Sequence, residues 1–96
     1  MEFEWDAAKE RTNSQMHGVS FGEAKELLVC GVDYLEIFDV EHSQDEDRFI
    51  AIGPLRRGLI MVVFTERLEG AIRIISARQA TTSESRLFWQ YMEAKV

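Results

Sequence analysis

The chain has 96 residues and a net charge of −6, and 46% of its residues are hydrophobic and 29% charged. This composition is typical of a folded protein rather than a disordered segment, and the length predicts a single domain over residues 1–96. The longest apolar run, Leu59 to Phe64, is far shorter than the ~20 residues that cross a membrane. The acidic N-terminus has no apolar signal core. We therefore expect a cytoplasmic protein without membrane attachment.

Charge is unevenly distributed along the chain. Residues 1–47 contain three Lys or Arg and thirteen Asp or Glu, a net charge of −10. Residues 48–86 contain seven arginines and three glutamates, a net charge of +4. Such asymmetry favours either a face that binds a polyanion or an internal pairing, in which the arginines hold acids of the first half.

Two helices are expected in the first third of the chain. Asp6 is a suitable N-cap for a helix from about Ala7 to Met16, and Gly18 suits the left-handed residue that follows a helix. A capping box at Ser20-Phe21-Gly22-Glu23 opens a second helix to about Cys30. Cys30 is the only cysteine, and its apolar neighbours predict a buried structural thiol. The second helix has an apolar stripe that predicts core packing: Phe21, Ala24, Leu27 and Leu28.

Residues 34–78 change to the alternating or β-branched pattern of strands. A second capping box, from Thr81 to Glu84, opens a final helix. Short connections predict antiparallel neighbours. The fold class is therefore α+β, with two N-terminal helices, an antiparallel sheet of about four strands and one C-terminal helix. The expected strands are Tyr34–Val40, Arg48–Ile52, Leu59–Arg67 and Ala71–Arg78, with a possible short first strand at Glu2–Trp5.

A two-residue loop at Glu69-Gly70 would set the register of the last hairpin. Glu66 then faces Arg73, Phe64 faces Ile75, and Met61 faces Arg78. Both faces of this hairpin are apolar at the centre, and so small a chain has few helices to cover them. We therefore expect a protein partner to bind part of one face of the sheet. One face carries Val62, Phe64, Ile75 and Ala77, and the other carries Val63, Ile72, Ile74 and Ser76.

An ordered set of short motifs runs along the chain. Each motif is weak alone, but together they cover nearly the whole chain without large gaps. The N-terminal motifs are Trp5-Asp6, Lys9, Asn13, His17-Gly18-Val19-Ser20-Phe21 and Glu23-Ala24. The central motifs are His42-Ser43, Glu46, Arg48-Phe49 and Ile52-Gly53. The C-terminal motifs are Val62-Val63-Phe64-Thr65, Arg73-Ile74-Ile75-Ser76-Ala77-Arg78, Ala80-Thr81 and Glu84. As an ordered set, these motifs resemble the BrnT family of toxin ribonucleases.

This resemblance implies a fold like that of the RelE-type toxins and an endoribonuclease toxin of a type II toxin–antitoxin pair, which inhibits translation and growth. It implies neutralisation by a ribbon-helix-helix antitoxin similar to BrnA. The expected complex is a heterotetramer that meets DNA only through the antitoxin. No cofactor is expected, and no metal site, because no Cys/His cluster has zinc spacing and residues 39–47 lack EF-hand spacing.

Some positions depart from the family pattern. Met16 stands where family members usually carry lysine, and Gln79 stands where a basic residue is usual. Each departure removes positive charge from places where a polyanion would bind. The alternative function is therefore a weak or inactive toxin homologue that acts as a binding partner and co-repressor in an antitoxin–DNA complex.

RNA cleavage without a metal needs a base for the 2′-hydroxyl, cations for the phosphorane and an acid for the leaving 5′-oxygen. His17 is the predicted acid or base. Arg48, Arg73 and Arg78 are the predicted phosphate and transition-state cations. The predicted RNA-binding residues are Lys9, Arg67 and Trp5.

Each of these residues has a structural alternative. His17 could compensate a helix dipole, and His42 could brace the acidic loop or take part in catalysis. Arg73 has Glu66 as an obvious partner, whereas Arg78 has no acid opposite in the expected register and is the favoured phosphate ligand. Both tryptophans, Trp5 and Trp89, could stack on bases or pack in the core.

Overall fold

The computed structural model describes residues 2–95 and confirms the predicted α+β class. No helix in this range is long and apolar enough to cross a membrane. The helices are α1 (Ala7–His17), α2 (Phe21–Val29) and α3 (Thr82–Ala94), with short 3-10 turns η1 (Val40–His42) and η2 (Leu68–Gly70). The strands are β1 (Phe3–Glu4), β2 (Leu35–Phe38), β3 (Arg48–Leu55), β4 (Gly58–Glu66) and β5 (Ile72–Gln79).

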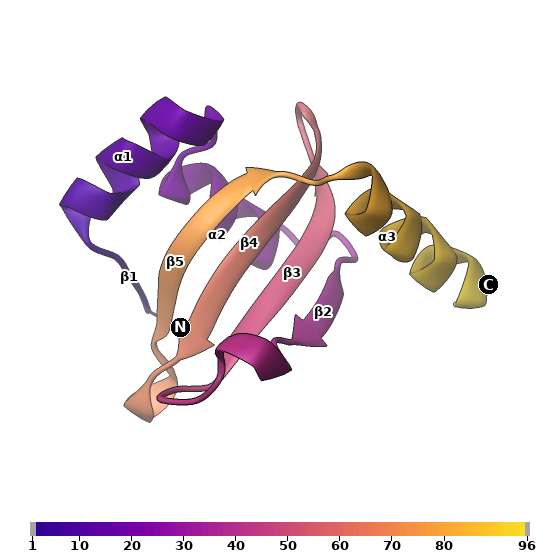
Figure 1. Cartoon of the computed structure of the whole chain (residues 1–96). Coiled ribbons are helices and arrows are strands. Elements are labelled where there is room, and N and C mark those ends of the chain that lie inside the picture. The colour runs from indigo at the N-terminus through magenta and orange to yellow at the C-terminus, as the bar shows by residue number, and fades with distance from the viewer. Residues whose placement is uncertain (1, 96) are drawn as a thin grey trace.

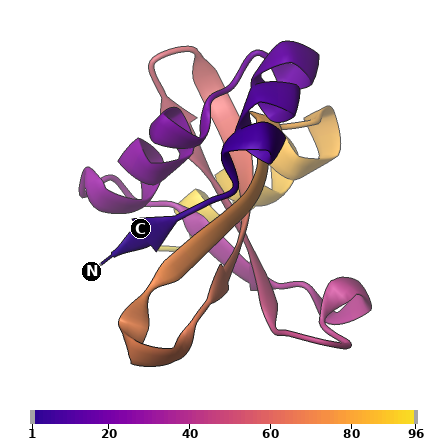
Figure 2. The same cartoon turned by 90° about the vertical axis from the view of Figure 1, so that its left-hand side faces the viewer.

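The five strands form one sheet in the order β1-β5-β4-β3-β2 (Figure 1). Strands β2 to β5 are antiparallel neighbours, as predicted, and the short first strand β1 pairs parallel to β5. Helix α2 lies on one side of the sheet, and η1 and α3 lie on the other, while α1 runs along β5 (Figure 2). No helix crosses the centre of the η1 side of β3, β4 and β5 (Figure 1). We call this side the open face.

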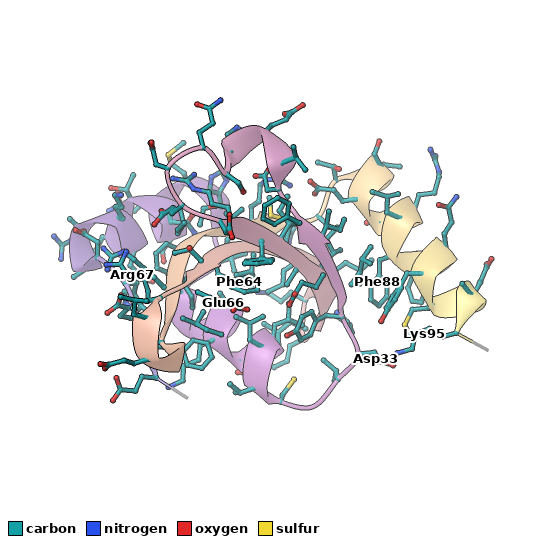
Figure 3. The ribbon with its side chains drawn as sticks, turned by 90° about the horizontal axis from the view of Figure 1, so that it is seen from below. Asp33, Phe64, Glu66, Arg67, Phe88 and Lys95 are labelled. Atoms are coloured by element: carbon teal, nitrogen blue, oxygen red, sulfur yellow. The ribbon has the colours of Figure 1, made fainter. Side chains whose placement is uncertain are left out.

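Two apolar cores follow from this arrangement. The main core joins the predicted stripe of α2 to the sheet, and Phe21, Leu27 and Phe64 are almost completely buried in it. Burying such a side chain stabilises the fold by roughly 1.5–3 kcal/mol. A smaller core lies on the opposite side, where Phe88 of α3 packs against Ile52 and Met61 (Figure 3).

Helix α3 covers only the β2–β3 end of the open face. An ion pair holds the C-terminal end of α3, because the Lys95 ammonium lies 2.8 Å from the Asp33 carboxylate (Figure 3). Leu87 and Trp89 of this helix remain 46% and 57% exposed. In the described part of the chain no helix lies over the centre of the open face, which agrees with the expectation of uncovered sheet surface (Figure 1). That a protein partner covers this surface stays a prediction.

The expected register of the last hairpin is correct only at one end. Met61 pairs with Arg78, as predicted, but a bulge after Val63 moves Phe64 opposite Ile74 instead of Ile75. The connection contains η2 and is longer than a two-residue loop, and the pairs between this connection and the bulge are shifted by one residue. This shift turns Ile72 and Ile74 into the main core and places Arg73 opposite Thr65 rather than Glu66.

The expectation for Cys30 is wrong, because its side chain is exposed. The apolar stripe of α2 ends at Leu27 and Leu28, and Cys30 is the C-cap beyond the end of this stripe. Its thiol donates to the carbonyl oxygen of Leu27 at 3.8 Å.

Asn13 of α1 is a buried polar residue that replaces a missing strand neighbour at the edge of β5. Its side-chain amide donates to the Ala77 carbonyl oxygen at 2.8 Å and accepts from the Ala77 N–H at 3.1 Å. The same amide nitrogen donates to the Val19 carbonyl oxygen at 2.9 Å. One side chain thus fixes α1 to both the sheet and the start of α2.

We expect Asn13→Ala to destabilise the protein by about 3 kcal/mol, because it leaves buried backbone groups without partners. For a chain of this size that lowers the melting temperature by at least about 10 °C. Thr12→Ala is the matched control, since the exposed Thr12 hydroxyl donates, among residues 2–95, only to the Ala8 carbonyl oxygen of its own helix. Thermal denaturation followed by circular dichroism checks both variants. Equal melting temperatures would contradict a stabilising role of Asn13.

Candidate functional site

A groove of about 350 Å³ crosses the open face between η1 and the start of α3. Its floor is apolar and comes from β3, β4 and β5, whereas its two walls carry charged and polar side chains. We call it the open-face groove. Its lining residues are Asp39, Glu41, His42, Arg48, Ile50, Met61, Val63, Ile75, Ser76, Arg78 and Glu84.

His42 stands on the η1 wall of the groove and is oriented by a carboxylate. Its Nδ1 lies 2.9 Å from Asp39 Oδ2, and the imidazole is 63% exposed whereas the Asp39 side chain is 13% exposed. The turn itself is braced, because the Ser43 hydroxyl donates to the Asp39 carbonyl oxygen and accepts from the Arg48 N–H. A carboxylate on Nδ1 leaves Nε2 available, which is the arrangement that orients a histidine for proton transfer.

Arg48 lies beside His42 at the beginning of β3. Its Nε is buried and has no hydrogen-bond partner among residues 2–95. Its nearest carboxylate, that of Glu46, is 3.9 Å from Nη2, which is too long for a hydrogen bond. A buried donor without a partner is unfavourable and uncommon in folded proteins. Arg48 therefore has no short carboxylate contact among the described residues, which leaves its terminal nitrogens with donor capacity for an anion.

Arg78 lies on the opposite wall and is held firmly. Its two terminal nitrogens contact the two carboxylate oxygens of Glu84 at 2.8 and 2.7 Å. This bidentate pair raises the pKa of Arg78 and lowers that of Glu84, to which the Thr81 N–H also donates. The expectation that Arg78 has no acidic partner is wrong, because the acid comes from α3 and not from the opposite strand.

Arg73 and Arg67 belong to an ionic network at one end of the open face. Glu4 of β1 lies 3.6 Å from Arg73 and 3.3 Å from Arg67, and Glu46 lies 3.7 Å from Arg67. The predicted Arg73–Glu66 pair is therefore replaced by Arg73–Glu4. Neither arginine lines the open-face groove.

The charge asymmetry of the sequence is largely an internal pairing. Five of the seven arginines in residues 48–86 lie within 4.0 Å of an acid in residues 1–47, and these are Arg48, Arg56, Arg57, Arg67 and Arg73. The positive charge available to a ligand is therefore smaller than the sequence count indicates, and it depends on the geometry of each pair.

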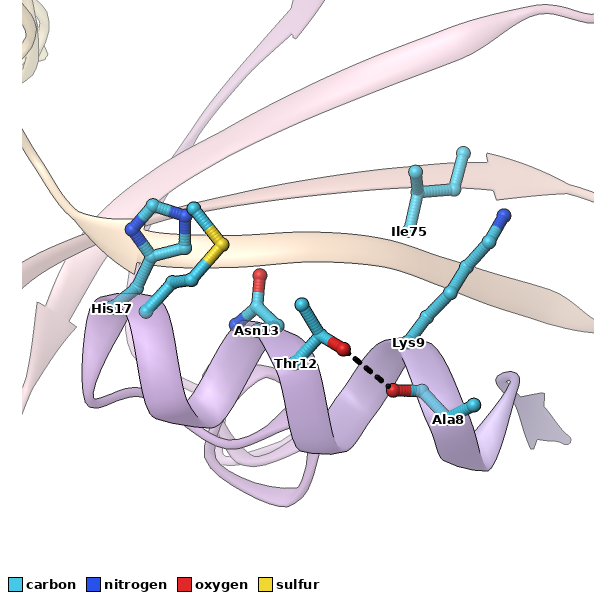
Figure 4. A pocket seen from close by; sticks show the side chains of 7 residues that line it. Ala8, Lys9, Thr12, Asn13, His17 and Ile75 are labelled. Carbon is cyan, nitrogen blue, oxygen red and sulfur yellow. Dashed lines mark hydrogen bonds between the residues drawn. The ribbon is translucent and has the colours of Figure 1, made fainter.

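A second depression, of about 340 Å³, lies between α1 and β5 (Figure 4). We call it the α1–β5 hollow. His17 and Lys9 stand at its two ends, and the bulged residue Ile75 lines both this hollow and the open-face groove. The lining residues are Ala8, Lys9, Thr12, Asn13, Met16, His17 and Ile75.

The structure thus divides the predicted site residues between several places. Arg48 and Arg78 share the groove, whereas His17 and Lys9 share the hollow. Trp5 packs edge-on against Phe21, with ring centroids 6.1 Å apart, at the margin of the main core. His42, weighed from the sequence between bracing and catalysis, joins the groove together with Ser76 and Glu84. The one sequence signal for this position of His42 is that the histidine lies among the acidic residues of 39–47.

The Arg78–Glu84 pair makes stability depend on pH. A carboxylate with a lowered pKa stabilises the fold fully above its unfolded pKa of about 4.3, and this contribution is lost as the pH falls through the lowered value. We expect the melting temperature of the wild type to fall more steeply between pH 6 and about pH 3 than that of Glu84→Gln. Glu93→Gln, on an exposed position of the same helix, is the control. Parallel pH profiles for all three proteins would contradict this expectation.

Comparison with known proteins identifies the family of the chain. The family model of the ribonuclease toxin BrnT of type II toxin–antitoxin systems matches residues 5–84. The crystal structure of the Brucella abortus ribonuclease toxin BrnT is similar, with 26% identity and a TM-score of 0.63, over 85% of this chain and 99% of that chain. None of the curated proteins compared with the chain matches it. The match to the family model covers most of the chain, which therefore belongs to the BrnT family of ribonuclease toxins of type II toxin–antitoxin systems.

Proposed function

We propose that this chain cuts RNA in the open-face groove by a metal-independent attack of a 2′-hydroxyl on the neighbouring phosphate. The observation that supports this is the meeting of His42, Arg48 and Arg78 in one groove. His42 accepts the 2′-hydroxyl proton while the oxygen forms a bond to phosphorus. Arg48 and Arg78 stabilise the charge of the phosphorane. The bond to the 5′-oxygen breaks, water protonates that oxygen, and a 2′,3′-cyclic phosphate remains.

The other predicted residues have supporting or competing roles in this proposal. Arg73 and Arg67 attract the RNA backbone toward the groove from the ionic network at its end. His17 is the second candidate for the acid or base, but the groove that holds Arg48 and Arg78 does not include it. Trp5 lies against the core, which favours packing over base stacking.

The partner proposed for this chain is a ribbon-helix-helix antitoxin similar to BrnA, in a cytoplasmic heterotetramer. The uncovered part of the open face and the exposed Leu87 and Trp89 of α3 give such a partner apolar surface. In this complex DNA is bound by the antitoxin and not by the present chain. Light scattering of the purified complex tests the two-to-two composition.

The decisive experiment uses the purified chain, free of any partner, with a defined naked RNA in the presence of EDTA. Cleavage that leaves 5′-hydroxyl ends is expected. Cleavage that stops with EDTA and returns with a divalent cation would contradict metal independence. No cleavage at stoichiometric protein would favour the alternative function, a co-repressor that has lost its chemistry.

Met16 provides a test of the departure from the family pattern. The side chain is 72% exposed at the last turn of α1, where a cation is favourable for the helix dipole. We expect Met16→Lys to raise RNA cleavage about tenfold, a change of about 1.4 kcal/mol in the barrier, without loss of stability. Gln15→Lys is the control, since it adds the same charge one residue away and lines neither depression. An equal rise in both variants would indicate general charge attraction and not a local effect.

A further inference from the structure

We propose that the α1–β5 hollow binds the base of a nucleotide next to the cleaved bond, so that the RNA strand crosses β5 at Ile75. This inference rests on the proposed function of the open-face groove. It adds a second subsite, which determines where along an RNA the chain binds and cuts.

The first argument is the position of the hollow. Ile75 is the residue that the β-bulge leaves unpaired, and its side chain lines both the groove and the hollow. The two depressions are therefore neighbours, separated by the strand β5. An RNA with a phosphate between His42 and Arg78 can reach the hollow with an adjacent nucleotide.

The second argument is charge. The hollow has no Asp or Glu among its lining residues, although the chain has seventeen acids and a net charge of −6. The open-face groove, in contrast, includes Asp39, Glu41 and Glu84. Lys9 and His17 stand at the two ends of the hollow (Figure 4), and neither has an ion-pair partner within 4.0 Å among the described residues. The Lys9 ammonium at one end and the imidazole nitrogens of His17 at the other can each donate a hydrogen bond to a phosphate, so a nucleotide between its two phosphates fits this pattern.

The third argument is the chemistry of the lining. Its middle is apolar, with the side chains of Ala8, Met16 and Ile75. The polar groups there are already used, since the Thr12 hydroxyl donates to Ala8 and the Asn13 amide bonds to Val19 and Ala77. A volume of about 340 Å³ suits one base with its ribose. The hollow therefore offers apolar and thioether contact to the face of a base, with little hydrogen bonding to its edge, and we expect it to select by size.

The test fills the hollow without changing any charge. Ala8→Phe places a ring in it, and Ala7→Phe makes the same substitution one residue earlier, at an exposed position that does not line the hollow. The probe is a hexanucleotide RNA with 2′-O-methyl riboses, which the proposed chemistry does not cut. We expect Ala8→Phe to weaken binding of this probe at least tenfold, and Ala7→Phe to change it less than twofold. Equal melting temperatures show that both variants are folded.

A second pair of variants tests the charge at the end of the hollow. Lys9→Gln is expected to lower the dependence of binding on salt by about one counterion. Arg11→Gln, exposed on the same helix and outside the lining, is expected to lower it less. In the wild type, NMR signals of Ala8, Thr12 and Ile75 are expected to shift when the probe binds.

The outcomes separate the subsite from the proposed catalysis. Hollow-dependent binding of the probe without cleavage of unmodified RNA would leave the subsite valid and overturn the proposed function. Cleavage by Ala8→Phe at the same sites, with unchanged probe binding, would overturn the subsite alone. A wild type that binds no RNA would overturn both. If Ala8→Phe binds RNA normally but no longer binds the proposed antitoxin, the hollow is a protein-docking surface and the proposal is wrong.

Discussion

His42→Gln is expected to lower RNA cleavage by ~10²–10⁴-fold, which is the usual contribution of a general base or acid. His42 shares the groove with Arg48 and Arg78, and the Asp39 carboxylate holds its imidazole at 2.9 Å. The side chain is 63% exposed, so its replacement leaves the core intact. We therefore expect a melting temperature within about 3 °C of the wild type, since surface substitutions change stability by no more than about 0.5 kcal/mol.

His17→Gln is the matched control for this prediction. Its side chain is also exposed, but it lies in the α1–β5 hollow, on the other side of Ile75. We expect it to alter RNA binding and to change the single-turnover rate constant at saturating RNA less than tenfold. The measurement is single-turnover cleavage of a defined RNA by both variants. If His17→Gln loses most of its cleavage rate while His42→Gln cleaves normally, His17 and not His42 is the catalytic histidine.

The sequence predicts most of the fold because its signals are local. Both capping boxes form as expected, with the Ser20 and Thr81 hydroxyls accepting from the N–H groups of Glu23 and Glu84. The apolar stripe of α2 becomes the main core. The register of β4 and β5 fails only beyond the bulge, because it depends on the conformation of η2, where Glu69 has a positive φ of 69°. Periodicity of apolar residues carries no information about such a turn.

The site is less predictable because its groups come together from distant elements. Arg78 pairs with Glu84 across the junction of β5 and α3, and Arg73 pairs with Glu4 through the parallel strand β1. Neither pairing follows from the spacing within a hairpin. The groove position of His42 depends on η1, a turn that has no apolar period. The residue types of the chemistry were therefore predictable, whereas their partners were not.

The two arginines of the groove are expected to respond differently to the same substitution. Arg78→Gln removes a bidentate ion pair and leaves the Glu84 carboxylate, 22% exposed, without its cation. Hydrogen bonds between charged groups contribute about 2 kcal/mol, so this variant is expected to melt roughly 10 °C lower. Arg48→Gln removes a guanidinium that has a buried Nε without a partner and only a long contact to Glu46. It is therefore expected to be as stable as the wild type.

Arg48→Gln is nevertheless expected to lower cleavage by ~10²–10³-fold, the usual loss when one transition-state donor is removed. Among the described residues its terminal nitrogens have only the long contact to Glu46, whereas those of Arg78 are largely committed to Glu84. Arg48→Lys keeps the charge but not the planar donor geometry, and should restore only part of the rate. Thermal denaturation and single-turnover cleavage of all three variants give the comparison. A contrary result would be full cleavage by Arg48→Gln and loss of cleavage by Arg78→Gln at temperatures where the Arg78 variant is folded. Arg78 would then be the main phosphate ligand, and the guanidinium of Arg48 would have no role in catalysis.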